Sequence, residues 1–175
     1  MNEKNKLIDK IIRVNQAGEI GAQRIYDAQR KVLKFLGKHG DVIKISQMAE
    51  DEQEHLDFFN AEIKRHNVRP TLLGPVWEFG ATAIGISTAI MGPKAAYACT
   101  EAVEEVIVEH YQKQIDMLEG VEPELQAKIK KFQKDEEGHK QAAINMGSHQ
   151  AIGYSVLRKF IRKTTQTAVY LTEKI

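Results

Sequence analysis

The sequence has almost no cysteine, because Cys99 is the only one among 175 residues. One cysteine excludes an intramolecular disulfide framework and any metal site built from several thiolates, and it fits a reducing compartment. The chain also lacks an excess of either charge, since 25 Lys and Arg face 24 Asp and Glu. This balance argues against a protein that binds nucleic acid through bulk charge. No apolar run follows the first charged residues, so we expect no signal peptide.

Proline is scarce too, and its four positions, 70, 75, 93 and 123, divide the chain into segments of helical periodicity. Apolar residues recur every three to four positions, and no run of alternating β-branched residues predicts a strand. We expect long helices over residues 7–37, 41–66, 93–119 and 123 into the 140s, a fifth from about 151, and a linker over 67–75. The sequence therefore predicts an all-α fold in a single domain over residues 1–175, with four helices of bundle length.

Residues 79–93 differ from the rest because they carry no charged side chain. As a helix this segment would extend about 22 Å, which is short of the ~20 residues that span a bilayer. Gly80, Gly85 and Gly92 weaken it further as a solitary helix. Two interpretations are open: a buried core helix notched by glycine, or a helix that lies in a membrane interface or lines the mouth of an apolar pocket.

The most informative feature is a repeat of polar residues. Each half of the chain reads Glu-x6-Tyr, then a helix break, then Glu-x-x-His. The residues are Glu19, Tyr26, Glu52 and His55 in the first half, and Glu104, Tyr111, Glu136 and His139 in the second. A single Glu-x-x-His is expected by chance in a chain of this composition. Two of them, each behind a Glu-x6-Tyr at nearly equal distance, are much harder to obtain by accident.

The repeat predicts a metal centre. On a helix, residues i and i+3 share a face, so the Glu and His of each Glu-x-x-His project together. A four-helix bundle that turns these faces inward collects the ligand set of a carboxylate-bridged di-iron or di-manganese centre. The candidate ligands are Glu19, Glu52, His55, Glu104, Glu136 and His139. Two divalent cations would neutralise four carboxylates whose burial otherwise costs several kcal/mol each. The alternative, solvated charges on helix exteriors, conflicts with the apolar neighbours of Glu19 and Glu104.

Several neighbouring residues need a separate interpretation. Glu101, Glu104 and Glu105 are all available on one predicted helix, and only Glu104 reproduces the Glu-x6-Tyr spacing of the first half. His110, next to Tyr111, either supports a carboxylate or a reaction intermediate near the metal, or packs as an ordinary helix histidine. The remaining acids near the motifs are interpreted as solvated charges: Asp51, Glu54 and Glu137.

The chain resembles the demethoxyubiquinone hydroxylases, the Coq7 family, over nearly its whole length. The resemblance rests on RVNQAGE at 13–19, Gly21-Ala22, Arg24-Ile25-Tyr26, VRPT at 68–71, Ala98-Cys99-Thr100 before Val103-Glu104-Glu105, His110-Tyr111, Lys131-Phe132, and AVYL at 168–171. It departs at Gln16, where many relatives have histidine. The resemblance assigns the metal to the same six residues, with Glu52 and Glu136 as bridges. It also places three residues near the centre as catalytic candidates: His110, Tyr111 and Tyr170.

The resemblance implies a ferritin-like four-helix bundle with an additional apolar interfacial helix and a C-terminal helix. It also implies an enzyme of ubiquinone biosynthesis, an O2-dependent monooxygenase that uses two iron ions to hydroxylate the demethoxyubiquinone ring. Its partners would be O2, a polyisoprenoid quinone and a membrane surface, without nucleic acid. We expect a peripheral protein on the cytoplasmic face of a bacterial cell membrane, or on the matrix face of the mitochondrial inner membrane for a processed eukaryotic chain.

The last predicted helix supports membrane contact because it combines apolar and basic residues. They are Ile152, Val156, Phe160 and Ile161 beside Arg158, Lys159, Arg162 and Lys163. The alternative for this cluster is a solvated face. A ferritin-like iron-storage or ferroxidase protein would use the same six ligands, but uncharged residues 79–93 do not suit the outside of a storage shell. A scaffold without metal is a third candidate. The sequence leaves open a homo-oligomer, the electron donor, and a partner protein that presents lipid or donates electrons.

Overall fold

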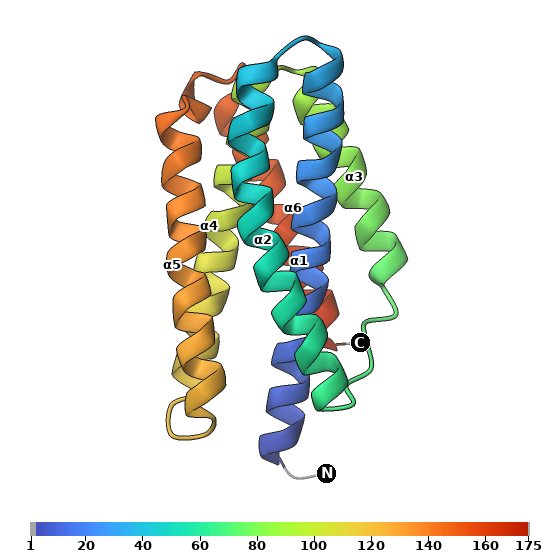
Figure 1. Ribbon diagram of the computed structural model, residues 1–175, viewed down its shortest axis with the longest axis vertical. Coiled ribbons are helices and arrows are strands. Elements are labelled where there is room, and N and C mark those ends of the chain that lie inside the picture. The colour runs from blue at the N-terminus through green and yellow to red at the C-terminus, as the bar shows by residue number, and fades with distance from the viewer. Residues whose placement is uncertain (1–2, 175) are drawn as a thin grey trace.

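The computed structural model describes residues 3–174, and within them it contains helices and no strand. The helices are α1 (Glu3–Phe35), α2 (His39–Arg65), α3 (Gly74–Ile90), α4 (Pro93–Met117), α5 (Pro123–Asn145), the short 3-10 helix η1 (Ser148–Gln150) and α6 (Tyr154–Lys174). Figure 1 shows α1, α2, α4 and α5 running along the long axis of the molecule. This arrangement confirms the prediction of an all-α bundle.

Two helical hairpins form the bundle, and one further helix covers each of them. α1 packs against α2 and α4 packs against α5, while α3 lies along α1 and α6 lies along α4. Pro93 and Pro123 stand at the beginnings of α4 and α5, where a missing backbone N–H costs nothing. Gly120 has a φ of +68° in the turn between them, a conformation that glycine adopts without strain. These ends lie where the sequence predicts them.

The second helix begins earlier than predicted. It starts at His39 rather than at Asp41, so Gly40 lies inside its first turn. Asp41 does not cap the helix; its carboxylate accepts a hydrogen bond from the Tyr97 hydroxyl at 2.5 Å. The backbone carbonyl of Lys38 accepts the first N–H groups instead, from residues 41 and 42. Asp41 thus joins α2 to α4.

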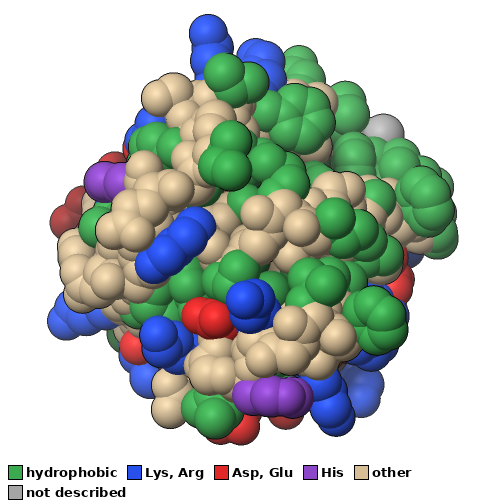
Figure 2. All heavy atoms as spheres, turned by 90° about the horizontal axis from the view of Figure 1, so that it is seen from above, with side chains coloured by type: hydrophobic (Ala, Val, Ile, Leu, Met, Phe, Trp, Pro, Cys, Tyr) green, Lys and Arg blue, Asp and Glu red, His purple; other side chains and the backbone are tan. Residues whose placement is uncertain are grey.

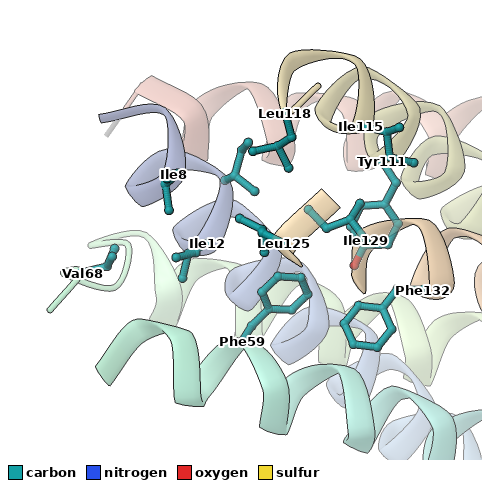
Figure 3. Close-up of a cluster of buried hydrophobic side chains, with 11 residues drawn as sticks. Ile8, Ile12, Phe59, Val68, Tyr111, Ile115, Leu118, Leu125, Ile129 and Phe132 are labelled. Carbon is teal, nitrogen blue, oxygen red and sulfur yellow. The ribbon is translucent and has the colours of Figure 1, made fainter. Parts of the chain in front are cut away.

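An apolar cluster fills the lower half of the bundle, between its four long helices and the segment after α2 (Figure 3). Its buried members are Ile8, Ile11, Ile12, Phe59, Val68, Tyr111, Ile115, Leu118, Leu125, Ile129 and Phe132. The rings of Phe59 and Phe132 meet edge to face, with centroids 5.7 Å apart. The Phe132 ring also lies 4.0 Å from the His55 ring. The core therefore packs directly against a residue of the polar repeat.

Most of the apolar segment lies in α3, which is partly buried and lines a cavity, while contact with a membrane stays a prediction. One face approaches α1 closely at Gly85, where an added Cβ would lie 2.6 Å from the carbonyl oxygen of Ile25. The other face leaves Phe79 and Ile90 exposed. Hydrophobic side chains also gather on one side of the upper end of the molecule (Figure 2). Among residues 3–174, no helix combines the length and apolar character needed to cross a membrane.

Replacing the glycine at this contact should separate α3 from α1. We expect Gly85→Ala to lower the free energy of unfolding by about 1–3 kcal/mol, because the new methyl group overlaps backbone. Gly80→Ala is the matched control, since a Cβ there meets no atom within 4 Å. It should be neutral or stabilise the helix by about 0.5–1 kcal/mol. Denaturant unfolding of both variants measures the difference, and equal stabilities would contradict the contact.

Candidate metal centre

The structure brings the six predicted ligands together in the middle of the bundle. They form two overlapping groups, within each of which the ligand atoms lie within 4.8 Å of one another. The groups are Glu19, Glu52, His55 and Glu136, and Glu52, Glu104, Glu136 and His139. Glu52 and Glu136 belong to both groups, and these are the positions that the family resemblance assigns to bridges. All six side chains are buried. Two groups that share two carboxylates can hold two adjacent cations.

The tyrosines of the repeat explain its seven-residue spacing. The Tyr26 hydroxyl on α1 donates a hydrogen bond to Glu104 on α4 at 2.9 Å. In return, the Tyr111 hydroxyl on α4 donates to Glu19 on α1 at 2.5 Å. Each half thus supplies the tyrosine that holds the terminal glutamate of the other half. Burial and the nearby carboxylates raise the pKa of both tyrosines well above the ordinary value, so both remain donors.

The histidines are held by a second crosswise exchange. Nδ1 of His55 and of His139 faces Glu136, at 3.0 and 3.1 Å. On the opposite side of each ring, Nε2 lies 3.3 Å from Asp135 for His55 and 3.2 Å from Asp51 for His139. Carboxylates in this position orient a ligating histidine and fix its tautomer.

This exchange adds a role to Asp51, which is exposed as the interpretation of a solvated charge predicts. Its side chain is 65% exposed, yet one carboxylate oxygen contacts His139. The Glu-x-x-His spacing by itself does not identify Asp135. The signal for both was present, because each motif reads Asp-Glu-x-x-His rather than Glu-x-x-His. The aspartate of one motif contacts the histidine of the other, a relation that appears only when α2 and α5 are placed face to face.

The pKa shifts at the centre indicate that positive charge there is favourable. Burial, together with the charges of Glu52 and Glu136, raises the pKa of both Glu19 and Glu104 well above the ordinary value. Burial opposes a charged imidazole at His55, but the adjacent Glu136 and Glu52 carboxylates outweigh it and raise its pKa to about 11. Without a metal, protons on the glutamates and histidines offset the negative charge of the carboxylates. A pair of divalent cations would take the place of these protons.

The chemistry of the donor set fits such cations. Among residues 3–174, His55 Nδ1 and Glu52 Oε1 are buried next to charged groups, at 3.0 Å from Glu136 and 3.4 Å from His139 Nδ1, yet neither atom makes a hydrogen bond of good geometry. Buried polar atoms of native proteins normally have a partner, and a bound ion supplies one. The centre offers oxygen and imidazole nitrogen without thiolate, a set that suits iron or manganese.

The two other acids on α4 have different partners. Glu101 is buried, and it accepts a hydrogen bond from the Tyr154 hydroxyl at 2.6 Å. Glu105 lies 2.5 Å from the guanidinium of Arg158 on α6. Neither belongs to the ligand groups, so the structure places only Glu104 of the three candidates at the centre.

A cavity of about 310 Å³ reaches the centre from one side. At one end it is lined by the carboxyl groups of the cluster, and elsewhere mostly by apolar side chains of α1, α3, α4 and α6. Trp77 on α3 donates a hydrogen bond from its indole N–H to Thr172 on α6 at 3.0 Å, and both residues line the cavity. The two covering helices thus form the cavity wall. The arrangement gives an apolar ligand direct access to the metal ligands.

The three predicted catalytic residues lie in different places. His110 and Tyr111 are buried and line the cavity. Tyr170 is 58% exposed and does not line it, although the neighbouring Ala168 and Val169 do. The structure therefore brings two of the three to the centre and leaves the third on the outer face of α6.

Removing an aspartate that contacts a candidate ligand histidine should weaken metal binding, although no ligand is lost. We expect Asp135→Ala to lower the affinity for Fe(II) or Mn(II) by about 10- to 100-fold, because His55 loses the carboxylate that orients it. Anaerobic titration against a competing chelator measures this affinity. Glu137→Ala is the control, since Glu137 lies on the same helix and pairs with Lys140 instead. Unchanged affinity in Asp135→Ala would contradict the role of this contact.

Comparison with known proteins identifies the family of the chain. Residues 6–172 match the family model described as ubiquinone biosynthesis protein COQ7. The chain is 39% identical over 169 residues to the 3-demethoxyubiquinol 3-hydroxylase of Rhodospirillum rubrum, covering 97% of this chain and 79% of that protein. It is 40% identical over 172 residues to the mitochondrial NADPH-dependent 3-demethoxyubiquinone 3-hydroxylase of Homo sapiens, covering 96% and 78%. For the mitochondrial 5-demethoxyubiquinone hydroxylase of Saccharomyces cerevisiae the identity is 37% over 183 residues, covering 96% and 78%. The chain belongs to the COQ7 family of ubiquinone biosynthesis proteins.

Proposed function

We propose that this protein is a monooxygenase that hydroxylates the ring of a demethoxyubiquinone during ubiquinone biosynthesis, as a single ferritin-like di-iron domain. The observation that carries the proposal is the mostly apolar cavity lined by four buried carboxyl groups, which cluster with two histidines. The names of the relatives, which describe hydroxylases of demethoxyubiquinone or demethoxyubiquinol, support the same reaction. A storage protein has no need of an apolar cavity at its metal ligands.

The proposed cofactor is a pair of iron ions held by the six clustered residues, with Glu52 and Glu136 shared. When bound, the iron pair supplies the activation of O2, from which one oxygen atom enters the ring and the other leaves as water, with two electrons from an external reductant. Tyr26 and Tyr111 hold the terminal carboxylates by hydrogen bonds. The aspartates beside the shared glutamates orient the histidines.

The cavity matches the two parts of the proposed substrate. Its carboxyl-lined end receives the ring, and the apolar walls contributed by α3 and α6 suit an isoprenoid tail. The walls include Ile25, Ile84 and Val103, which exclude water from the reacting end. The residues of this chain thus orient the ring toward the metal ligands and keep the site dry.

A membrane surface is the proposed source of the substrate, and we place the protein peripherally on the cytoplasmic face of a bacterial cell membrane or, for a processed eukaryotic chain, on the matrix face of the mitochondrial inner membrane. The two helices that form the cavity wall also carry exposed apolar residues, including Phe79 on α3 and Val156 and Phe160 on α6. Two residues of the basic cluster of α6 already have acidic partners within the bundle. Arg158 and Arg162 form ion pairs with acidic residues of α4. The sequence of α6 alone does not show that α4 packs against it.

The proposed reaction is tested with protein reconstituted anaerobically with Fe(II), then supplied with a reductant, a short-tail demethoxyquinone and 18O2. We expect mass spectrometry to show a product that contains one 18O atom. Glu104→Ala should hold fewer than two iron ions per chain and should lose most of the activity, because one terminal ligand is missing.

The control for this test is Glu109→Ala, which removes an exposed acid from the same helix and should keep both ions and activity. Oxidation of iron with unchanged quinone would contradict the hydroxylase and favour a ferroxidase. Two ions per chain in Glu104→Ala would show that another acid is the ligand.

Membrane contact is tested by sedimentation with anionic phospholipid vesicles. We expect Phe160→Ser to weaken vesicle binding roughly tenfold, because an exposed phenyl ring of α6 no longer enters the interface. Ile43→Ser on α2 is the control, since Ile43 is equally exposed but lies outside α3 and α6 and does not line the cavity. Equal binding by both variants would argue against α6 as the contact surface.

A further inference from the structure

Asn15, Gln114 and His110 form a buried polar network beside the candidate metal centre, and the proposed reaction does not yet assign it a role. Gln114, one turn after His110 on α4, is 1% exposed. Its side-chain amide forms a reciprocal pair with Asn15 on α1, in which each amide donates to the oxygen of the other at 2.8 Å. Nε2 of Gln114 also lies 2.7 Å from Nε2 of His110. The pair holds the Gln114 amide so that it presents an N–H group to the histidine.

A donor at His110 Nε2 determines where the ring carries its proton. Because Nε2 accepts the hydrogen bond from Gln114, the neutral imidazole has its N–H on Nδ1. Burial lowers the pKa of His110 to about 4; Glu173 acts in the opposite direction, while Lys113 and Lys10 lower the pKa further. The ring is therefore neutral near pH 7.

The second ring nitrogen is available to a ligand. Among residues 3–174, no group forms a hydrogen bond with His110 Nδ1. The ring lines the cavity, together with Glu19 and Glu104 of the metal centre. Most of the remaining cavity wall is apolar. An N–H donor in such surroundings favours a ligand that places an acceptor oxygen beside it.

The internal repeat shows that this network belongs to one half only. Six residues after Glu104 the second half has His110, whereas six residues after Glu19 the first half has Ile25. Gln29 is the counterpart of Gln114, but its amide N–H groups bond residues of α3 and α4. Within the described part of the chain, its Oε1 has no hydrogen-bond partner. The glutamine–histidine contact is therefore a specific feature of the second half.

We propose that Asn15 and Gln114 are positioning residues that hold His110 as the Nδ1–H tautomer, and that this N–H donates a hydrogen bond to a ring oxygen of the bound quinone. The second clause rests on the function proposed above. A quinone ring carries carbonyl and methoxy oxygens, whereas its isoprenoid tail carries no acceptor. A donor that lines the cavity together with Glu19 and Glu104 therefore orients the ring and selects the carbon that faces the metal ligands.

The tautomer is measured by the ring 15N chemical shifts of His110 in the full chain, with Zn²⁺ in place of iron to avoid paramagnetic broadening. We expect a protonated Nδ1 and an unprotonated Nε2 in the wild type. Gln114→Glu places an acceptor at Nε2 and should move the proton to that nitrogen. Gln114→Met removes the donor and should give a mixture of tautomers. A wild-type ring protonated on Nε2, or the wild-type tautomer in both variants, would overturn the assignment.

The matched control is Gln112→Glu, which makes the same change of charge on an exposed side chain of α4. It should leave the His110 shifts unchanged. In the iron-loaded protein, Gln114→Glu should raise the KM for a short-tail demethoxyquinone about tenfold, the effect of losing one hydrogen bond, while Gln112→Glu keeps the wild-type KM.

Ligand contact is measured on the Zn²⁺-loaded wild type by the Nδ1–H proton resonance. A short-tail demethoxyquinone should shift it downfield, and an alkylbenzene with the same tail, which has no ring oxygen, should not. If the wild type forms no hydroxylated quinone while His110 has the expected tautomer, the proposed function is wrong and the role of Asn15 and Gln114 stands. If the wild type hydroxylates the quinone but the resonance does not respond to it, the function stands and the contact inferred here is wrong.

Discussion

The rest of the structure depends on four glutamates buried between two helical hairpins. Carboxylates this close together in a dry interior repel one another, and burial adds to the cost. Hence the pKa of Glu19 and of Glu104 is raised, while burial at Glu52 is outweighed by contacts with His139 and His55, which lower its pKa to about 2. Positive charge at the centre of the bundle is therefore favourable, and the surrounding hydrogen bonds hold the carboxylates in place.

The apolar parts of the fold serve the same centre in two ways. One part is packing: Phe132 lies against the His55 ring, so the lower core limits how the histidine can turn. The other part is access, because α3 and α6 do not close the bundle completely and leave the cavity along α1 and α4. Close contact at Gly85 sets the position of α3, and the bond from Trp77 to Thr172 ties it to α6. The cavity is thus a consequence of how the covering helices are attached.

Much of the fold and the centre could be predicted from residue spacing alone. Pro93, Pro123 and Gly120 act through local backbone geometry, which is why the helix ends they predict agree with the structure. The ligand cluster could be predicted because Glu and His seldom recur on matching helix faces of two halves unless both halves contribute ligands to one centre. The choice of Glu104 among three acids follows from the same spacing.

What could not be predicted depends on contacts between segments. Asp51 bonds a histidine of the other hairpin, and Arg158 is neutralised by an acid of α4, so neither role is visible in its own helix. Tyr170 shows a different difficulty. Adjacent positions on a helix point about 100° apart, so Ala168 and Val169 face the cavity while Tyr170 faces outward.

The crosswise partners of the ligands have a consequence for how the bundle opens. Each ligand group draws side chains from both hairpins, and the tyrosine and aspartate that steady one half come from the other. An isolated hairpin would keep half of the candidate metal ligands. It would lose the tyrosine and aspartate contacts that the other hairpin supplies to them. Any motion that parts α1 and α2 from α4 and α5 would therefore loosen both cation positions simultaneously. Loading of the proposed cation pair would therefore be thermodynamically linked to closure of the two halves, and occupancy would be a cooperative property of the assembled bundle.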